Sequence, residues 1–354
     1  MNPLKHYDYL IVGQGLAGSL LAWRLITAGQ RVLVIDNGQP AAASRVAAGL
    51  INPVTGKRLV KEANAERFLA MARDWYTELG KQFNHVFLHD KPMLRLFDPD
   101  EIKPIWEKRR ADPAYQRFIG ASLNPHECGY PQGGFIQNQT GYLASTLLLN
   151  AIELWLQERQ SLIATQFDYS DITISSPLGW RGIHIDKIIF CEGAAIAHNP
   201  WFNTLPMQPA QGEILTLQTH QPLPHWIVNA GRWLLPLGEG RFKLGATYTW
   251  PTEHAPLTDT TSETAKSELL TDLAKLFPSL TDYKIIAHEA GIRPGSKDRR
   301  PLIGFHHRYP DLAVFNGFGS KGSMLIPYYA QHFVDVLLKK TALDSDVNIT
   351  RVIS

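Results

Sequence analysis

The stretch from residue 9 to residue 36 constrains the fold of this chain more than any other part of its sequence. Residues 9–12 and 31–35 are apolar runs bounded by turn residues, which predicts two buried strands. Between them, residues 17–28 are rich in Leu and Ala, which predicts a helix. A strand, a helix and a second apolar strand at this spacing predict a βαβ unit in a parallel sheet, and hence an α/β, Rossmann-like protein.

The loop between the first strand and the helix reads Gly-Gln-Gly-Leu-Ala-Gly and matches the pattern G-x-G-x-x-G. Gly13 allows a tight turn, Gly15 lets the backbone approach a pyrophosphate, and Gly18 lets the helix pack closely on the strand. The helix N-terminus adds unpaired N–H groups and a partial positive charge. Because a strand and a helix flank the loop, it predicts a dinucleotide site, with Leu16 and Ala17 included, rather than a purely structural turn.

An acidic residue ends the second strand. The carboxylate of Asp36 can accept hydrogen bonds from ribose hydroxyls, and its charge disfavours a 2′-phosphate, which argues against NADP. We include its neighbour Asn37 in the same predicted cofactor site.

The segment that follows consists of small and flexible residues. The glycine loop alone does not choose between NAD and FAD. The segment after it does, because small residues suit a close approach of the backbone to a flat ring system such as a flavin. We predict that the segment contributes Ser44, Arg45, Ala47, Ala48 and Gly49 to the cofactor site.

At this segment the chain resembles the D-amino-acid-oxidase-like family of FAD-dependent oxidoreductases, which includes glycine oxidase and sarcosine oxidase. Three later motifs follow in the family's order: Phe-Cys-Glu-Gly-Ala-Ala at 190–195, Gly-Ile-Arg-Pro with its Pro-Leu-Ile-Gly sequel at 291–304, and Asn-Gly-Phe-Gly-Ser-Lys-Gly at 316–322. Cys191 stands where the family usually has Ala. The resemblance extends from residue 8 to residue 338 and is specific to the family rather than to one member.

The resemblance implies a bound FAD. Ahead of the last helix, the final glycine turn suits the stabilisation of negative charge on a reduced flavin, because a helix N-terminus carries a partial positive charge. Lys321 would add a cation there, with an exposed surface lysine as the alternative. From the internal turn and this final turn the predicted cofactor contacts are Gly193, Ala194, Gly317, Gly319, Ser320, Lys321, Gly322 and Ser323.

Arg293 is the predicted substrate-binding residue. A guanidinium can hold a carboxylate through two parallel hydrogen bonds, and the resemblance implies that role for the Arg of this motif. The alternative is a structural arginine that pairs with Asp298 or with a carbonyl at a strand end. Tyr248 is a second candidate contact by resemblance, with core packing as its alternative.

These motifs predict a FAD-dependent oxidoreductase that oxidises the C–N bond of an amino acid or an N-substituted glycine, by hydride transfer to the flavin N5. The electron acceptor, oxygen or a quinone, is left open. Residues 317–322 also resemble the FAD domain of bifunctional tRNA wobble-uridine methylaminomethyl enzymes, so oxidation of carboxymethylaminomethyl-uridine in tRNA is one alternative. A 2-hydroxy-acid dehydrogenase and a non-catalytic FAD-binding protein are the others.

Composition bears on the partners and the cellular compartment of the protein. A net charge of +2 gives no independent support for tRNA binding, and two cysteines in 354 residues favour a reducing compartment. No apolar run reaches the length of a membrane span, so we predict a cytoplasmic protein. The closely spaced residues 126–128 do not resemble a zinc site, and we predict no metal.

Helical spacing of apolar residues predicts long helices over 61–83 and 141–156. Alternation within 206–260 predicts antiparallel strands. We therefore predict a FAD-binding domain interleaved with an antiparallel-sheet (α+β) substrate domain. The predicted FAD-binding domain comprises residues 1–80, 130–205 and 290–354, and the predicted substrate domain comprises residues 81–129 and 206–289.

Overall fold

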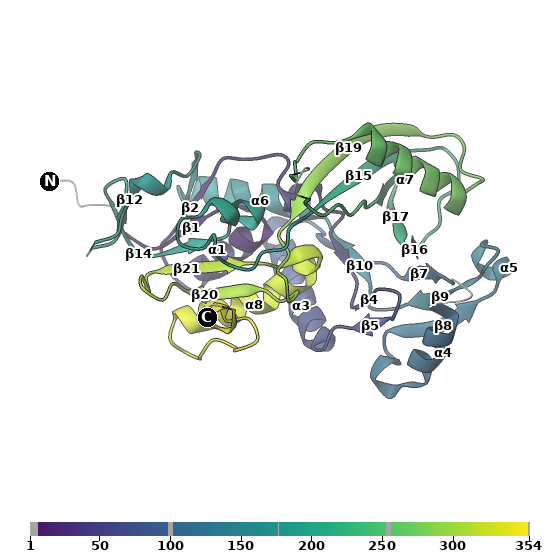
Figure 1. Ribbon diagram of the computed structural model, residues 1–354, viewed down its shortest axis with the longest axis horizontal. Coiled ribbons are helices and arrows are strands. Elements are labelled where there is room, and N and C mark those ends of the chain that lie inside the picture. Colours follow the sequence, from purple (N-terminus) through teal and green to yellow (C-terminus); the bar gives the residue numbers. More distant parts are fainter. Residues whose placement is uncertain (1–5, 98–101, 176, 253–255, 353–354) are drawn as a thin grey trace.

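The computed structural model describes residues 6–97, 102–175, 177–252 and 256–352. They form two large sheets, one toward each end of an elongated molecule (Figure 1). No helix among these residues is both long enough and apolar enough to cross a membrane.

The first sheet contains five parallel strands in the order β11-β2-β1-β14-β21. Three short strands pair antiparallel at its margins, β20 with β21 and the pair β13 and β12 beside β14. The strands are β1 (His6–Val12), β2 (Val32–Asp36), β11 (Leu162–Ala164), β12 (Ile172–Thr173), β13 (Gly179–Trp180), β14 (Ile183–Phe190), β20 (Leu302–Phe305) and β21 (Leu312–Asn316).

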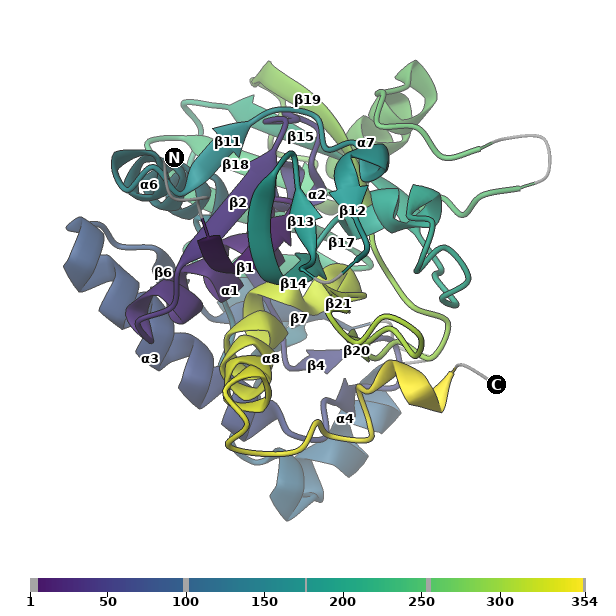
Figure 2. The ribbon, with the colours of Figure 1, turned by 90° about the vertical axis from the view of Figure 1, so that its left-hand side faces the viewer.

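Alternating apolar side chains let this sheet bury both faces. Ile11 and Val34 face one cluster, packed against four helices, whereas Leu10 and Leu33 face the other, with Trp180. The helices of the first cluster are α1 (Leu16–Thr27), α3 (Ala65–Phe83), α6 (Ser145–Glu158) and α8 (Gly322–Leu337), and Figure 2 shows α8 and α3 beneath the sheet.

The second sheet is mostly antiparallel and runs in the order β19-β15-β18-β17-β16-β7-β9-β8. Its strands are β19 (Lys284–Arg293), β15 (Ala210–Gln218), β18 (Arg241–Gly245), β17 (Arg232–Gly238), β16 (Ile227–Ala230), β7 (Met93–Leu96), β9 (Gly134–Gln137) and β8 (Ile119–Leu123). Helix α7 (Glu263–Leu276) covers the outer face, where Leu269 and Leu273 pack against Leu215 and Leu217. The inner face carries Ile214 and Leu235 and turns toward the first sheet.

Smaller elements join the two sheets. The three strands β3 (Leu50–Ile51), β10 (Gly141–Leu143) and β6 (Leu88–Asp90) form one small sheet, and β4 (Val54–Thr55) pairs with β5 (Val60–Lys61). The short helices are α2 (Ala43–Val46), α4 (Ile102–Ala111) and α5 (Pro125–Cys128), with 3₁₀ turns at Pro113–Tyr115, Tyr169–Asp171, Gly193–His198, Gly319–Lys321 and Ile349–Arg351.

The predicted α/β class and the mixture of parallel and antiparallel sheets are confirmed, but two helix boundaries are wrong. The helix predicted over 61–83 begins at Ala65, because Lys61 is paired with Val54 in a hairpin. The helix predicted over 141–156 begins at Ser145, because 141–143 lie between β3 and β6 as a strand. In both cases tertiary pairing overrides the helical spacing of the apolar residues.

The division into two interleaved domains stays a prediction. Its ranges include residues 1–5, 98–101, 176, 253–255 and 353–354, which lie outside the described residues. In the described part, β9 pairs with β7 and β8 in the second sheet. This membership would move the predicted boundary at residue 130 to a point after Gln137.

Gly18 offers a test of the helix packing. A Cβ added at Gly18 would lie 1.9 Å from the carbonyl oxygen of Gly13, so we expect Gly18→Ala to destabilise the protein by about 3 kcal/mol. Gly38 is the matched control, because a Cβ there meets no atom within 4 Å. The only cost of the substitution is the strain of a left-handed backbone (φ +69°). Gly38→Ala is expected to cost about 1 kcal/mol. Urea unfolding measures both, and equal costs would contradict the packing argument.

Candidate active site

The glycine loop lies between the ends of β1 and β14. Gly13 has φ +103°, and a Cβ there would lie 2.6 Å from the carbonyl oxygen of Cys191. Helix α1 then begins at Leu16, with no side-chain cap at Gly15 and no acidic residue in its first turn. Backbone N–H groups at such a helix end are available to an anionic ligand.

Asp36 holds this loop to the end of β2. Its carboxylate accepts the backbone N–H of Gln14 at 2.6 Å and that of Gly38 at 2.6 Å. The neighbouring Asn37 is engaged elsewhere, because its amide donates to Gln166 Oε1 at 2.6 Å. Asp36 therefore lies beside the glycine loop as expected, and Asn37 points to the strand β11 side.

The small-residue segment is fixed on the start of α1 and on α6. Ser44 Oγ accepts the N–H of Leu16 at 3.0 Å, which joins α2 to the first turn of α1. Arg45 forms an ion pair with Glu153 at 2.7 Å. Ser145 Oγ donates to the carbonyl of Ala47.

The end of this segment requires a glycine. A Cβ at Gly49 would lie 2.0 Å from the carbonyl oxygen of Leu143, and the backbone there has φ +67°. Only glycine combines that conformation with so close a backbone approach. Ala48 is buried just before it and packs with Val46 against the inner face of the second sheet.

The three later motifs meet at one place. Asn316 donates its side-chain amide to the carbonyl of Gly193 at 2.9 Å, and Gly319 donates its N–H to the carbonyl of Pro294 at 3.1 Å. Gly295 and Phe318 form a β-bridge beside them. Segments more than a hundred residues apart in sequence therefore form one surface at the carboxyl ends of β14 and β21.

Other predicted residues of these motifs lie in the adjoining turns. Ala194 follows Gly193 in a 3₁₀ turn, and Ser320 lies in the 3₁₀ turn before α8. Gly317 has φ +80° and packs against Leu302.

Helix α8 supplies a second open N-terminus, starting at Gly322. It has no side-chain cap and no acidic residue in its first turn. Ser323 is buried there, and its carbonyl accepts the Tyr76 hydroxyl at 2.7 Å. Lys321 is not a free surface lysine, since its Nζ lies 2.5 Å from Glu62 Oε2. That pairing neutralises part of the charge that the sequence suggested for this turn.

Arg293 ends β19 on the inner face of the second sheet. Its guanidinium lies flat over Gly212, where a Cβ would be 2.1 Å from one of its nitrogens. It donates to the carbonyls of Gln211 at 3.3 Å and Thr247 at 3.4 Å, and it stacks over the Tyr248 ring at 4.8 Å. Gly212 thus provides the space that the guanidinium occupies.

No acidic side chain among the described residues pairs with Arg293. Asp298, the partner in the structural alternative, pairs with Arg351 at 2.8 Å instead. Burial lowers the pKa of Arg293 from its usual value, but a guanidinium remains protonated at neutral pH. The alternative role of Arg293 as a structural arginine therefore holds only for its contacts with backbone carbonyls, and those hydrogen bonds are long. Even partial burial of a cation without a counter-ion carries a desolvation cost, which an anionic ligand would offset.

Two aromatic rings lie beside this cation. Tyr248 is 51% exposed and Trp250 is 44% exposed, and their ring centroids are 4.9 Å apart. Tyr248 is therefore not a core residue, contrary to its alternative interpretation.

Lys243 on the inner face is a residue that sequence reasoning missed. Its Nζ lies 3.4 Å from the carbonyl oxygen of Val46 and 3.7 Å from Glu289 Oε2. A signal was present, because Lys243 stands between Phe242 and Leu244, both fully buried on the outer face. In a strand, the residue between two such side chains must face the opposite side.

Arg95 is the other missed cation. It is 6% exposed on β7 and donates to the carbonyls of Val54 and Gly56. Burial lowers its pKa to about 10, and its Nε has no hydrogen-bond partner. It holds the β4–β5 hairpin against the second sheet.

Comparisons with known proteins identify the family of this chain. A family model described as FAD dependent oxidoreductase matches residues 8–336. The chain belongs to this family. It is similar to the glycine oxidase of Pseudomonas aeruginosa, with 25% identity over 349 residues that cover 93% of this chain and 94% of that protein.

A further relative and a solved structure extend the comparison. The chain is 25% identical over 358 residues to the tRNA 5-methylaminomethyl-2-thiouridine biosynthesis bifunctional protein of Aromatoleum aromaticum, which covers 88% of this chain and 54% of that protein. The crystal structure of glycine oxidase from Geobacillus kaustophilus superimposes with a TM-score of 0.84 at 22% identity, covering 99% of this chain and 100% of that one. The predicted family, fold, FAD dependence and enzyme class are confirmed.

The residues of this chain fit a bound FAD. The N-cap residues of α1 and α8 make no side-chain cap, and neither helix has an acidic residue in its first turn, which suits a pyrophosphate and an electron-rich ring. In α1 the N–H of Leu16 donates to Ser44 Oγ, and the later N–H groups of the first turn remain for a ligand. At Gly13 and Gly49 an added Cβ would meet backbone atoms, so both turns are tightly packed and need glycine. An acidic residue, Asp36, stands at the end of β2, where a ribose hydroxyl would need an acceptor.

Asp36→Asn tests the anchoring of the glycine loop. An amide offers one acceptor oxygen, so one of the two N–H groups that Asp36 now accepts would lose its partner. We expect FAD to bind the variant about tenfold more weakly. Fluorescence titration of the apoprotein with FAD measures this.

Asp168→Asn is the control for that substitution, because Asp168 is an exposed carboxylate that caps only a 3₁₀ turn through the N–H of Ser170. It is expected to leave FAD affinity unchanged. Equal affinities in the Asp36 variant and the parent would refute the anchoring role.

Proposed function

We propose that this protein oxidises the C–N bond of an amino acid or an N-substituted glycine. The observation that carries the proposal is the half-buried guanidinium of Arg293, which lies on the inner face of the second sheet without an acidic partner among the described residues. When bound, FAD supplies the acceptor for the hydride and the electrons. The glycine oxidase relatives support an amine substrate of this kind.

Arg293 would bind the substrate carboxylate through two parallel hydrogen bonds. Its present hydrogen bonds to the carbonyls of Gln211 and Thr247 are 3.3 to 3.4 Å long, at the weak end of the normal range. A carboxylate offers shorter, charge-assisted bonds. The Tyr248 ring beneath the guanidinium holds its plane and so sets the direction from which the carboxylate approaches.

The position of Arg293 relative to the cofactor segments supports the same proposal. A Cβ at Gly291, two residues before it on the same face, would lie 3.3 Å from Val46 Cβ, so α2 lies against this strand. On the other side, the N–H of Gly319 reaches the carbonyl of Pro294. We propose that the substrate binds between the inner face of the second sheet and the flavin, with Lys243 as a second cation of that face.

Anaerobic reduction of the flavin tests the proposal. The purified holoenzyme is mixed without oxygen with glycine, N-methylglycine, D- and L-alanine, and glycolate, and the visible flavin band is followed. Loss of the band with an amine supports the proposal, and loss with glycolate alone replaces it by the hydroxy-acid alternative. No loss with any of these, nor with tRNA bearing carboxymethylaminomethyl-uridine, would favour the non-catalytic alternative.

Arg293→Ala tests the carboxylate site separately from the fold. We expect the variant to keep its bound FAD and to lose the spectral change that glycolate or a similar carboxylate causes in the parent, with at least about a hundredfold weaker binding. Arg300→Ala is the matched control, because Arg300 is exposed and pairs with Asp346 at 2.9 Å. An unchanged titration in Arg293→Ala would remove the central residue of the proposal.

The exposed ring pair predicts which substrates are preferred. Tyr248 contacts Arg293, and Trp250 contacts Tyr248, so a ring carried on the substrate nitrogen would reach Trp250 while the carboxylate stays on Arg293. We expect N-benzylglycine to reduce the flavin with about tenfold higher kcat/KM than N-methylglycine, the gain typical of one stacked ring.

Trp250→Ala is expected to remove most of that ratio, whereas Tyr309→Ala, which truncates an exposed tyrosine outside this region, should keep it. Steady-state rates with both substrates provide the comparison. A parent enzyme that prefers N-methylglycine would confine the site to small amines.

A further inference from the structure

A second cluster of reactive side chains lies away from the proposed active site. Among the described residues, His6, His184 and Asp186 form the one group of three potential metal ligands whose donor atoms all lie within 4.8 Å of one another. His6 begins β1, and the other two lie near the start of β14. The glycine loop follows the opposite end of β1, so this cluster is distinct from the cofactor site.

The strand register explains why these three side chains meet. β1 and β14 are parallel neighbours, and His6 pairs with His184 across the ladder. Asp186 follows two residues later on β14 and therefore projects from the same face. A residue pair at i and i+2 plus one residue on the adjacent strand gives three donors on one face, at the spacing of about 4.8 Å between strands.

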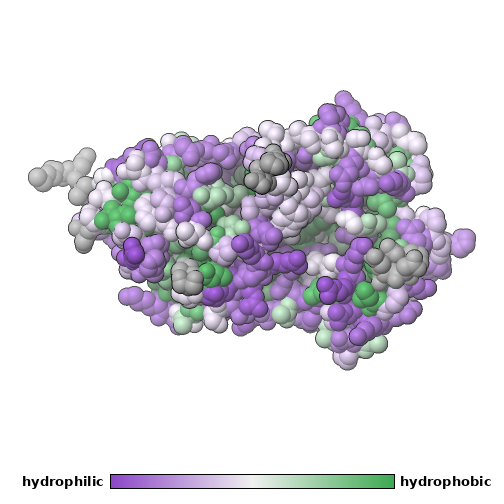
Figure 3. All heavy atoms as spheres, in the orientation of Figure 1, coloured by the Kyte–Doolittle hydropathy of each residue, from purple (hydrophilic) through white to green (hydrophobic). Residues whose placement is uncertain are grey.

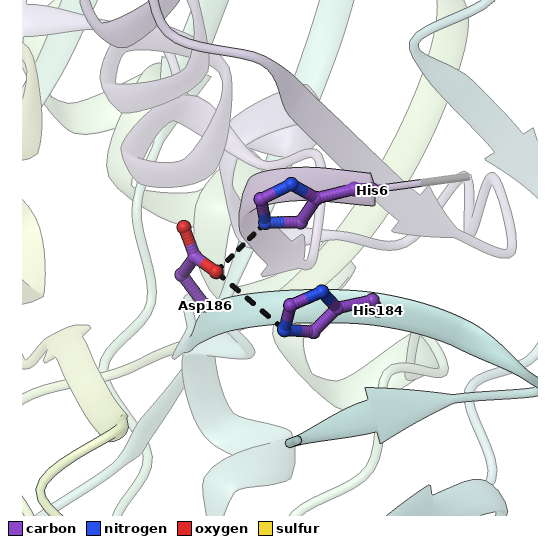
Figure 4. A group of neighbouring side chains, drawn as sticks. All are labelled: His6, His184 and Asp186. Carbon is purple, nitrogen blue, oxygen red and sulfur yellow. Dashed lines mark hydrogen bonds and ion pairs between the residues drawn. The ribbon is translucent and has the colours of Figure 1, made fainter. Parts of the chain in front are cut away.

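The donor atoms already converge. His6 Nε2 lies 2.7 Å and His184 Nε2 lies 3.7 Å from the same oxygen of Asp186, Oδ1. The two imidazole rings are stacked, with centroids 4.3 Å apart and planes 13° from parallel. Figure 4 shows one nitrogen of each ring pointing at the Asp186 carboxylate.

Only small side-chain movements separate this arrangement from a coordination shell. Zn²⁺ binds imidazole nitrogens and carboxylate oxygens at about 2.0–2.2 Å, so its ligand atoms lie roughly 3.4 Å apart. The cluster is also accessible, with side-chain exposures of 30% for His6, 37% for His184 and 50% for Asp186. A fourth position would face water.

We propose that His6, His184 and Asp186 bind one divalent transition-metal ion of the zinc class. Two imidazoles and one carboxylate favour Zn²⁺, Co²⁺ and Ni²⁺ over Mg²⁺ and Ca²⁺, which prefer oxygen ligands. The ion would join β1 to β14, the two strands whose other ends carry the glycine loop and the turn at Gly193. Its effect is therefore to stabilise the cofactor-binding sheet rather than to take part in the oxidation.

Arg31 tunes the strength of this site. Its guanidinium donates to His6 Nδ1 at 2.9 Å and to Asp8 Oδ1 at 2.6 Å. In a neutral His6 that accepts from Arg31, the proton is on Nε2 and is donated to Asp186. A metal ion at Nε2 takes the place of that proton, so the neutral ring carries its proton on Nδ1 instead. Nδ1 then no longer accepts a hydrogen bond from Arg31, which keeps only its ion pair with Asp8. Arg31 thus competes with the metal for His6.

Calorimetric titration of the untagged holoenzyme with Zn²⁺, after removal of bound metal by a chelator, tests the site. We expect one Zn²⁺ per chain and a higher melting temperature in its presence, because ligands that bind only the folded state stabilise it. Replacing Zn²⁺ with Co²⁺ should give the visible absorption of a coordinated ion, and Mg²⁺ should give no heat. No binding of Zn²⁺ would overturn the proposal.

Variants locate the ion. His184→Gln and Asp186→Asn are each expected to weaken Zn²⁺ binding at least about tenfold. Loss of a residue that only hydrogen-bonds to a metal ligand already costs about that much, and loss of a ligand should cost no less. Arg31→Gln should strengthen it, and a weaker site in that variant would overturn the assignment of Nε2 as the ligand atom. His307→Gln is the matched control, because His307 lies beside a second histidine, with ring centroids 4.6 Å apart, but has no acidic partner among the residues that the structure describes.

The same series excludes binding elsewhere. Flavin absorbance and circular dichroism confirm that each variant is folded, which is expected since all the substituted side chains are at least partly exposed. If His184→Gln binds Zn²⁺ as tightly as the parent, the ion lies at another place and the proposal fails. If only His307→Gln loses binding, the proposal fails as well.

Discussion

The close contact between Gly18 and the carbonyl of Gly13 sets how near α1 lies to β1, and the cofactor end of the molecule depends on that distance. The same loop packs Gly13 on the carbonyl of Cys191, at the end of β14. Asp36 then ties the loop to β2 through two backbone N–H groups. Three neighbouring strands therefore end at one compact turn, and the open N-terminus of α1 faces the space beside it.

The second sheet carries basic side chains on its inner face. Its outer face is covered by α7, but the inner face carries Arg293 and Lys243 among apolar residues. Arg293 fits there because Gly212 leaves room for the guanidinium. Partial burial of a cation without an acidic partner among the described residues disfavours the folded state, and under the proposed function a bound substrate carboxylate would offset this cost. The proposed function would therefore link the stability of this face to substrate binding.

Particular residues show which features could be predicted from the amino-acid sequence and which could not. The βαβ unit, the glycine loop and Asp36 were predictable because each depends on local spacing and on the steric freedom of glycine. The helix start at Ser145 was not, because residues 141–143 are drawn into a strand by β3 and β6. Lys321 illustrates the same limit, since its pairing with Glu62 joins segments remote in sequence.

Local patterns were therefore enough to predict the α/β class and, by resemblance, the family, and both are confirmed. They also predicted a set of turns for the cofactor site, which stays a prediction. Tertiary structure alone decided that Arg293 has no acidic partner among the described residues, that Asp298 pairs with Arg351, and that Lys243 lies near the carbonyl of Val46. It also brought His6 and His184 into one rung of a parallel ladder, although 178 positions of chain separate them. Counter-ions and ligand clusters depend on which strands become neighbours, and that is decided by packing of the whole chain rather than by any local sequence.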